Sequence, residues 1–326
     1  MRYTFCTLFD KNYLFKGLAM HQSLTAHCKC FTLWVLCMDE ETYRILERMG
    51  LRDVKLIHLS DFEDDDLRKA RQERSRAEYC YTCTAPLILY VMGQETQTDQ
   101  VAYVDSDLFF YSDPQPIYTE LGSKSVLIIG HRFSPEYRSF ERESGIYNVS
   151  MVIFKKDQDG LECLNWWKEQ CLRACYFDVE AGLCYDQKYL DDWPTRFRNV
   201  HVLQGKGGGL APWNISNYQL RKREGRVYVD ADELIFYHFH SLKIFTLLDK
   251  YVFRVSRGYR FTGEQRALVY SPYVWELCRA IDGVRKKNPD FESGLSKIRF
   301  HELLNSPLPT IRKVVGILRT GNLMVS

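Results

Sequence analysis

Two aspartates, Asp105 and Asp107, stand one residue apart in the apolar segment VAYVDSDLFFYSDP, residues 101–114. The segment is rich in β-branched and aromatic residues and ends in Ser-Asp-Pro, which predicts that both carboxylates stand at the end of a buried strand. Two buried like charges destabilise a fold unless a cation neutralises them. The pair therefore predicts a divalent metal site at the rim of a sheet, where the metal would hold a diphosphate.

The spacing of these aspartates is not specific by itself. It recurs in polar surroundings at three other places, namely Asp64/Asp66, Asp157/Asp159 and Asp230/Asp232. The apolar context is what distinguishes Asp105 and Asp107 from those pairs. The alternative interpretation is a strand-end turn in which both carboxylates face water.

Strands and helices are predicted to alternate before and after this segment. Strand-like stretches cover residues 2–9, 31–38, 54–59, 101–104, 126–129 and 145–154. Helix-like stretches cover residues 17–27, 39–50, 83–93 and 161–177, and the charge-dense run 61–78 suits a solvated helical face. Alternation with short connections implies right-handed crossovers. We therefore expect an α/β fold with a mainly parallel central sheet flanked by helices.

Composition limits the possible classes of protein. The chain has 326 residues, of which 45% are hydrophobic and 26% charged, and its formal net charge is +2. These values are typical of a globular protein and lack the basic excess of a protein that coats nucleic acid. Eleven cysteines without a regular framework indicate free thiols in a reducing compartment, so we expect a cytoplasmic protein. No signal peptide or membrane span is evident, and the sequons at Asn148 and Asn214 are expected to stay unglycosylated.

The C-terminal part of the sequence has a different character. From about residue 245 it is aromatic and basic without evident strand alternation, which predicts a helical extension. We therefore divide the chain into a catalytic domain, residues 1–244, and a C-terminal extension, residues 245–326, that faces the acceptor or a membrane. Residues 308–324 combine apolar and basic side chains and suit peripheral contact with the inner face of an anionic membrane. The alternative is a helix packed on its own domain.

Five segments carry a resemblance to a known family. They are FDKNYLFKGLAMHQSL (9–24), VAYVDSDLFF (101–110), GIYNVSMVIF (145–154), CYDQKYL (184–190) and FYHFHSLK (236–243). In this order, over residues 3–243, they resemble glycosyltransferase family 8 and related retaining sugar-nucleotide transferases of the GT-A fold, a Rossmann-like α/β architecture. The resemblance implies a metal-dependent hexosyltransferase.

The resemblance also implies roles for individual residues in donor binding. Asp10 and Asn12 would contact the nucleotide base and ribose, and Tyr13 would stack on the base. Ser106, between the two metal-binding aspartates, and Asn148 would join the donor-binding residues, Asn148 at the sugar. The physical fit is sound, because a planar base needs an aromatic face and a polar partner at its edge.

Further roles follow from the last two segments. Asp186 and Gln187 would lie near the anomeric carbon, although an aspartate at such a place can also cap a helix. His238 would complete the metal site with Asp105 and Asp107, with His240 as the other candidate, and Lys243 would reach the diphosphate. The chain departs from the family pattern in three respects. Lys243 comes one position early and lacks the following Pro-Trp, Ser150 replaces a glycine, and YTCTAPLIL lacks a basic residue, so that Thr84 or a neighbour would have to supply that contact.

The expected reaction is transfer of a sugar from a nucleoside diphosphate donor to an acceptor. The resemblance implies a UDP-sugar as donor, Mn²⁺ or Mg²⁺ as metal, a glycan or lipid-linked saccharide as acceptor, and retention of anomeric configuration, as in polysaccharide or lipopolysaccharide biosynthesis. Two alternatives stay open. A nucleotidyltransferase is disfavoured because such enzymes begin with a glycine-rich loop, whereas the first glycine here is Gly17. A non-catalytic sugar-nucleotide-binding protein would use the same site without chemistry.

Overall fold

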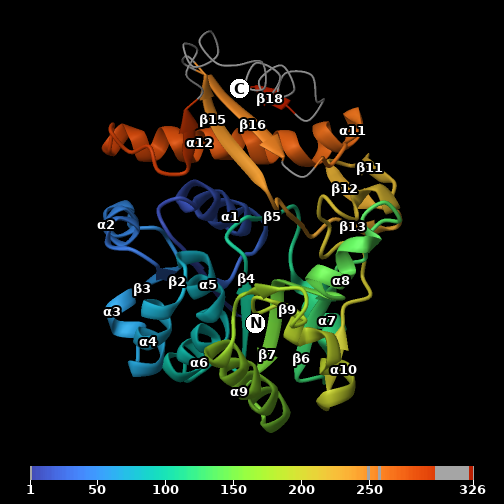
Figure 1. Ribbon diagram of the computed structural model, residues 1–326. Helices are drawn as coiled ribbons and strands as arrows, with labels where there is room; N and C mark the ends of the chain where they lie inside the picture. The colour runs from blue at the N-terminus through green and yellow to red at the C-terminus, as the bar shows by residue number, and fades with distance from the viewer. Residues whose placement is uncertain (1, 248–249, 256–257, 298–322, 326) are drawn as a thin grey trace.

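The centre of the molecule is a seven-stranded sheet with helices on both faces (Figure 1). The computed structural model describes residues 2–247, 250–255, 258–297 and 323–325. The strands lie in the order β10-β6-β7-β4-β1-β2-β3. Their bounds are β1 Tyr3–Phe9, β2 Phe31–Cys37, β3 Val54–His58, β4 Gln100–Val104, β6 Val126–Gly130, β7 Tyr147–Lys155 and β10 Val200–Val202.

All strands of this sheet run in the same direction except β7, which is antiparallel to both β4 and β6. The predicted α/β class with a mainly parallel central sheet flanked by helices is therefore confirmed. The parallel strands β1, β2 and β4 end at one rim of the sheet, and Asp10, Asp39 and Asp105 lie just beyond their carboxyl ends.

Alternating side chains of each strand feed two hydrophobic clusters. In β1, Phe5 and Phe9 face one cluster, whereas Cys6 and Leu8 face the other. The first cluster includes side chains of α1 (Leu14–His27), α7 (Gln115–Leu121) and α12 (Ser271–Lys287). The second includes side chains of α6 (Thr84–Gln94) and α9 (Gln158–Arg173). The α9 residues Leu164, Trp167 and Cys171 are fully buried there, at spacings that put them on one face of the helix.

Local sequence signals explain where the remaining N-terminal helices begin and end. Asp39 caps α2 (Glu40–Met49) by accepting from the Thr42 amide, and Gly50 ends it in the left-handed conformation with φ 59°. The predicted charge-dense run forms α3 (Leu59–Phe62), α4 (Asp65–Glu73) and α5 (Arg76–Thr82). It divides because Asp64 caps α4, and Ser75 starts α5 in a capping box with Glu78.

The C-terminal part is not helical throughout, so that part of the sequence prediction is wrong. β15 (Leu242–Leu247) and β16 (Lys250–Val255) form an antiparallel hairpin in a four-stranded sheet with β17 (Leu295–Lys297) and β18 (Leu323–Val325). In β15, buried Leu242 and Ile244 flank exposed Lys243, the alternation of a half-buried strand. The predicted division at residues 244 and 245 falls within β15, and residues 308–322 of the predicted membrane segment lie outside the described residues.

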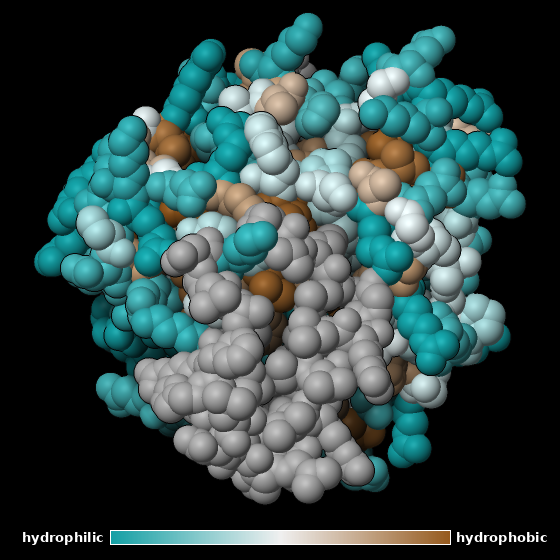
Figure 2. Space-filling model, turned by 90° about the horizontal axis from the view of Figure 1, so that it is seen from above, coloured by the Kyte–Doolittle hydropathy of each residue, from teal (hydrophilic) through white to brown (hydrophobic). Residues whose placement is uncertain are grey.

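The C-terminal elements lie across the molecule above α1 (Figure 1). Helix α12 packs against α1. In the segment after α12, the ring of Phe291 meets the ring of Phe15 of α1 edge to face, with centroids 5.5 Å apart. Where described residues form the face seen from above, small apolar areas are separated by hydrophilic side chains (Figure 2). Among the described residues, no helix has both the length and the apolar character needed to cross a bilayer.

Shorter elements connect this frame. They are β5 (Leu108–Phe110) paired with β14 (Phe236–His238), the sheet of β11 (Leu220–Arg223), β12 (Arg226–Val229) and β13 (Asp232–Glu233), the hairpin of β8 (Phe177–Asp178) and β9 (Leu183–Cys184), and the helices η1 (Arg138–Phe140), α8 (Glu141–Ser144), η2 (Lys188–Asp192), α10 (Trp193–Arg196), η3 (Ile215–Asn217), α11 (Gly263–Gln265) and η4 (Arg266–Tyr270). The structure describes all eleven cysteines, and it joins none of them in a disulfide. The sequon residues Asn148 and Asn214 are buried, which leaves no room for a glycan on either.

Candidate metal and donor-binding site

A short strand pair brings an imidazole to the two aspartates. Asp105 follows the last residue of β4, and after Asp107 the chain enters β5, which pairs with β14 in antiparallel fashion. In this register His238 lies opposite Leu108. The amide of Phe239 donates to the backbone oxygen of Asp107 at 2.9 Å. Residues far apart in the sequence therefore meet at the carboxyl end of β4.

The three predicted metal ligands lie together. His238 Nε2 is 3.1 Å from Asp107 Oδ1 and 3.6 Å from Asp105 Oδ2. One potential ligand atom from each residue lies within 4.8 Å of the others. This cluster contains His238 and not His240, whose ring centroid is 5.7 Å from that of His238. Of the two histidines considered from sequence, His238 is the one that faces both carboxylates.

The donor set of this cluster fits a divalent cation. Two carboxylates and one imidazole form a mixed oxygen and nitrogen set that Mn²⁺ or Mg²⁺ can accept. The Nδ1 atom of His238 is buried and has no hydrogen-bond partner among the described residues. The ring is held instead by packing against Trp213, edge to face, with centroids 5.4 Å apart. His238 Nε2 therefore points at the carboxylates without support from a second hydrogen bond.

Burial and charge act differently on the members of the cluster. Burial raises the pKa of Asp105 to about 6, against the opposing effect of His238. Burial also acts on Asp107, but His238 and Lys16 outweigh it and hold the pKa of that carboxyl below its ordinary value. Burial lowers the pKa of His238, but Asp107 outweighs burial, so the net shift is upward. The cluster therefore favours positive charge beside Asp107.

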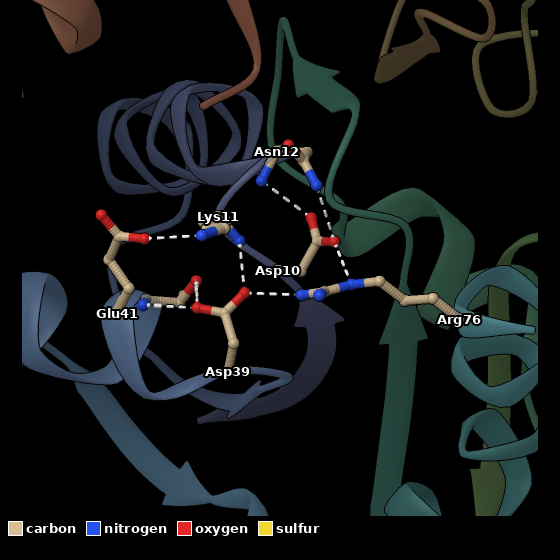
Figure 3. Close-up of polar contacts among 7 residues, drawn as sticks. Asp10, Lys11, Asn12, Asp39, Glu41 and Arg76 are labelled. Atoms are coloured by element: carbon tan, nitrogen blue, oxygen red, sulfur yellow. Dashed lines mark hydrogen bonds and ion pairs between the residues drawn. The ribbon is translucent and has the colours of Figure 1, made fainter. Parts of the chain in front are cut away.

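The predicted base and ribose residues lie at the neighbouring strand end (Figure 3). Asp10 Oδ1 accepts from the amide of Asn12 at 2.8 Å, and Asp10 Oδ2 accepts from Asn12 Nδ2 at 3.0 Å. Arg76 bridges two strand ends, because its Nε lies 2.6 Å from Asp10 Oδ2 and its Nη2 lies 2.6 Å from Asp39 Oδ2. Tyr13 is 44% exposed at the start of α1, which leaves its ring accessible to a ligand.

The predicted residues of the reaction centre form a second group. Asn148 Nδ2 donates to Gln187 Oε1 at 2.9 Å, and Gln187 Nε2 donates to the backbone oxygen of Ser144 at 2.7 Å. Asp186 is buried, and burial, assisted by the charge of Asp105, raises its pKa to about 8 against a hydrogen bond with Thr84. Asp186 does not cap η2. The N-cap residue of η2 is Gln187, and its side chain makes no capping hydrogen bond.

The remaining two predicted donor-binding residues differ in exposure. Ser106 is buried between the aspartates, whereas Lys243 is exposed on β15. The charge of Lys243 contributes to lowering the pKa of Lys16, after the larger effect of burial, so the two ammonium groups lie near enough to repel each other. Thr84, which the sequence suggested for a missing basic contact, instead hydrogen-bonds with Asp186.

The chain was compared with known proteins. The uncharacterized protein YfnD of Bacillus subtilis (strain 168) is 35% identical over 293 residues, which cover 89% of this chain and 93% of that protein. The chain belongs to the YfnD family. The uncharacterized protein YfnF of the same organism is 30% identical over 306 residues, which cover 91% of this chain and 99% of that protein. No protein-family model matches the sequence.

Solved structures similar to this YfnD-family chain are more distant. The galactosyltransferase LgtC in complex with donor and acceptor sugar analogs is 14% identical, with a TM-score of 0.49, over 85% of this chain and 95% of that chain. Mouse xyloside xylosyltransferase 1 in its apo form is 13% identical, with a TM-score of 0.47, over 74% of this chain and 98% of that chain.

Two cations of this YfnD-family site were not found by sequence reasoning. Arg76 begins α5 directly after its capping residue Ser75, so a basic side chain stands at a fixed helix start near Asp10. Lys16 lies three residues after Tyr13, which puts both on the same face of α1. The available signals were the capping box for Arg76 and, for Lys16, a lone charge within the apolar stretch LFKGLAM.

Proposed function

We propose that this chain is a GT-A type, metal-dependent glycosyltransferase that moves a hexose from a UDP-sugar to a glycan or lipid-linked saccharide with retention of configuration. Polysaccharide or lipopolysaccharide biosynthesis would be its setting. The observation that carries the proposal is the meeting of Asp105, Asp107 and His238 at the rim where Asp10 and Asn12 also lie. A metal-ligand group beside a base-binding group suits a nucleoside diphosphate.

In this proposal the chain's own residues bind and orient the donor. Tyr13 stacks on the base, Asp10 and Asn12 bind its polar edge and the ribose, and the Asp105–Asp107–His238 group holds the metal, with Ser106 between the aspartates. When bound, a divalent cation would neutralise charge on the diphosphate as a Lewis acid. Lys243 adds a cation on the diphosphate side.

At the reaction centre, Asn148, Asp186 and Gln187 act on the sugar. The hydrogen bond between Asn148 and Gln187, 2.9 Å long, fixes two polar groups relative to each other. Burial keeps the Asp186 carboxyl mostly protonated near pH 7, so it can donate a hydrogen bond to a sugar hydroxyl and position it.

Exposed aromatic residues beside this centre support a saccharide acceptor. Tyr81 is 41% exposed and stacks on Tyr185 with ring centroids 4.4 Å apart. Phe177, on β8, is also exposed, and its ring is tilted against that of Tyr185 with centroids 6.1 Å apart. The charges of Asp186 and Asp105 act on Tyr81, so the aromatic group adjoins the site. Aromatic faces with a polar edge suit the apolar face of a pyranose ring.

The proposal is tested in two steps. A thermal-shift screen of nucleotide sugars with and without Mn²⁺ should raise the melting temperature only for the matching donor with metal, because ligands stabilise the folded state that binds them. Incubation of that donor with candidate acceptor saccharides should then release UDP. Binding without acceptor-dependent UDP release would instead identify a non-catalytic sugar-nucleotide-binding protein. Absence of any metal-dependent nucleotide binding would refute the proposal.

The C-terminal extension enters the proposal as the part that faces the acceptor or a membrane. A membrane role for residues 308–324 is tested by sedimentation of the full chain with anionic and neutral vesicles. The anionic vesicles alone should bind the chain, and mutation of the basic residues of that segment should abolish binding.

A further inference from the structure

Lys16 is a buried lysine in the candidate donor site. It lies in the first turn of α1, and only 6% of the residue is exposed. Lysine is rarely buried to this extent unless its charge has a partner. Its Nζ atom lies 3.6 Å from Asp107 Oδ2, which is an ion pair longer than a well-formed hydrogen bond.

The position of Lys16 between two candidate ligand groups is specific. The same Nζ atom lies 4.2 Å from the centre of the Tyr13 ring, and the other oxygen of Asp107 is already paired with His238 Nε2 at 3.1 Å. Lys16 therefore stands between the ring proposed to hold the base and the cluster proposed to hold the metal. In a nucleoside diphosphate, the groups between the base and the metal-bound end are the ribose and the phosphates.

We propose that the ammonium group of Lys16 binds the diphosphate of the donor, as a second cation beside the metal cluster. This inference rests on the proposed function and deepens it. An ammonium is a compact point charge that suits phosphate oxygens. Lys243, the lysine expected from sequence to do this, is exposed on β15, whereas Lys16 is held in place by the packing of α1 beneath α12.

This role predicts effects of opposite sign on two ligands. A positive charge 3.6 Å from Asp107 repels a metal ion at the cluster but attracts a diphosphate. Its removal should tighten Mn²⁺ binding in the absence of nucleotide and weaken UDP binding in the presence of saturating Mn²⁺. A lysine that only supports the fold would weaken both or neither.

The test compares Lys16→Met, Lys16→Gln and Lys16→Arg with the wild-type chain. The matched control is Lys11→Met, because the nearby Lys11 side chain is only partly buried, 39% exposed, and pairs with Glu41 at 2.9 Å. Isothermal titration calorimetry would measure Mn²⁺ alone, and then UDP and uridine at saturating Mn²⁺. Circular dichroism and the melting temperature would show which variants fold, and Lys16→Gln serves if Lys16→Met does not.

The neutral variants should lose UDP affinity by about ten-fold or more, the size of one hydrogen bond to a charged group, while uridine affinity stays within about two-fold. Lys16→Arg should retain most of the UDP affinity, and Lys11→Met all of it. Unchanged UDP affinity in folded neutral variants overturns the inference alone, as does an equal loss for UDP and uridine. If the wild-type chain binds no UDP with Mn²⁺, the proposed function fails first and the inference falls with it.

Discussion

At the scale of single residues, the two aspartates of the metal cluster are not equivalent. Asp107 is more buried and contacts both His238 and Lys16, whereas Asp105 accepts a hydrogen bond from the Tyr103 hydroxyl at 3.1 Å. Tyr103 therefore orients Asp105, whereas His238 and Lys16 orient Asp107. This division of partners gives each carboxylate a fixed direction toward the common centre.

The first prediction is that Asp105→Asn or Asp107→Asn abolishes metal-dependent turnover without unfolding the chain. An amide has the size of the carboxyl group but not its charge, so Mn²⁺ affinity should fall by about 100-fold or more. Mutation of residues that only hydrogen-bond to a metal ligand already lowers metal affinity by up to about 100-fold. Mn²⁺ titration and UDP release measure the two effects. The control is Asp65→Asn, whose side chain is 99% exposed. Normal turnover in both variants would refute the metal site.

The second prediction concerns Asp186 and pH. Its pKa is about 8 in the folded chain against an ordinary 3.8. Below about pH 4 the carboxyl is protonated in both the folded and the unfolded chain. As pH rises from about 4 to 8, the unfolded chain loses this proton while the folded chain keeps it, so the free energy of unfolding falls. Above about pH 8 the folded chain loses the proton as well, and the stability that the protonated Asp186 gave at low pH is gone.

Asp186→Asn should remove this dependence, because an amide does not ionise. Urea denaturation at several pH values, in metal-free buffer, would measure the free energy of unfolding of both proteins. The stability gained by the variant relative to wild type should grow between about pH 4 and 8 and then stay constant, reaching several kcal/mol. A difference that does not vary with pH would show that Asp186 ionises normally in the folded chain.

At the scale of elements, the start of α5 links two strand ends through Arg76. The third prediction is that Arg76→Ala lowers UDP affinity several-fold and changes stability little. The ion pairs are partly exposed, and such pairs contribute at most about 1 kcal/mol, but Asp10 and Asp39 lose the cation that holds them together. Calorimetry with UDP and Mn²⁺ measures the loss. Arg68→Ala is a matched control because both side chains are 52% exposed, and equal affinity in the two variants would contradict the role of Arg76.

Elements also show what the sequence could predict. The strand before Asp105 carries a local signal, a short apolar run followed by turn residues. The helix capped by Asp39 carries another, a capping aspartate at its start and a glycine at its end. The meeting of His238 with Asp105 depends on pairing between β5 and β14, which no local pattern specifies. The family resemblance supplied that contact. The bridge from Arg76 to Asp10 and Asp39 had no such guide, because it joins three separate elements.

The hairpin of β15 and β16 shows a different limit. Its sequences LKIFTL and KYVFRV have the β-branched and aromatic content of strands, but the aromatic and basic stretch from about residue 245, without evident strand alternation, suggested a helical region. The alternation around Lys243 was the signal that should have decided. Short strands give short patterns, and these are hard to separate from helix by period alone.

At the scale of the whole molecule, α1 lies between the central sheet and α12. The buried cluster that includes Phe15 and Leu18 of α1 also includes Leu277 and Ile281 of α12. Tyr13 stands at the start of α1 and Lys16 lies in its first turn, so the packing of α12 on α1 holds two residues of the candidate donor site in place. If the chain is divided near residue 244, each of the two parts contributes residues to this one hydrophobic cluster.

The fourth prediction tests whether that sharing is energetic. Leu277 is fully buried in α12, so Leu277→Ala should lower the free energy of unfolding by about 2–5 kcal/mol and, because α1 loses support, should weaken UDP binding as well. Trp275→Ala is a control on the same helix, since Trp275 is 61% exposed. Urea unfolding followed by both circular dichroism and tryptophan fluorescence should give one transition that shifts as a whole in Leu277→Ala. An early transition confined to part of the signal, with UDP affinity preserved, would instead show that the C-terminal extension unfolds separately from a self-sufficient domain of residues 1–244.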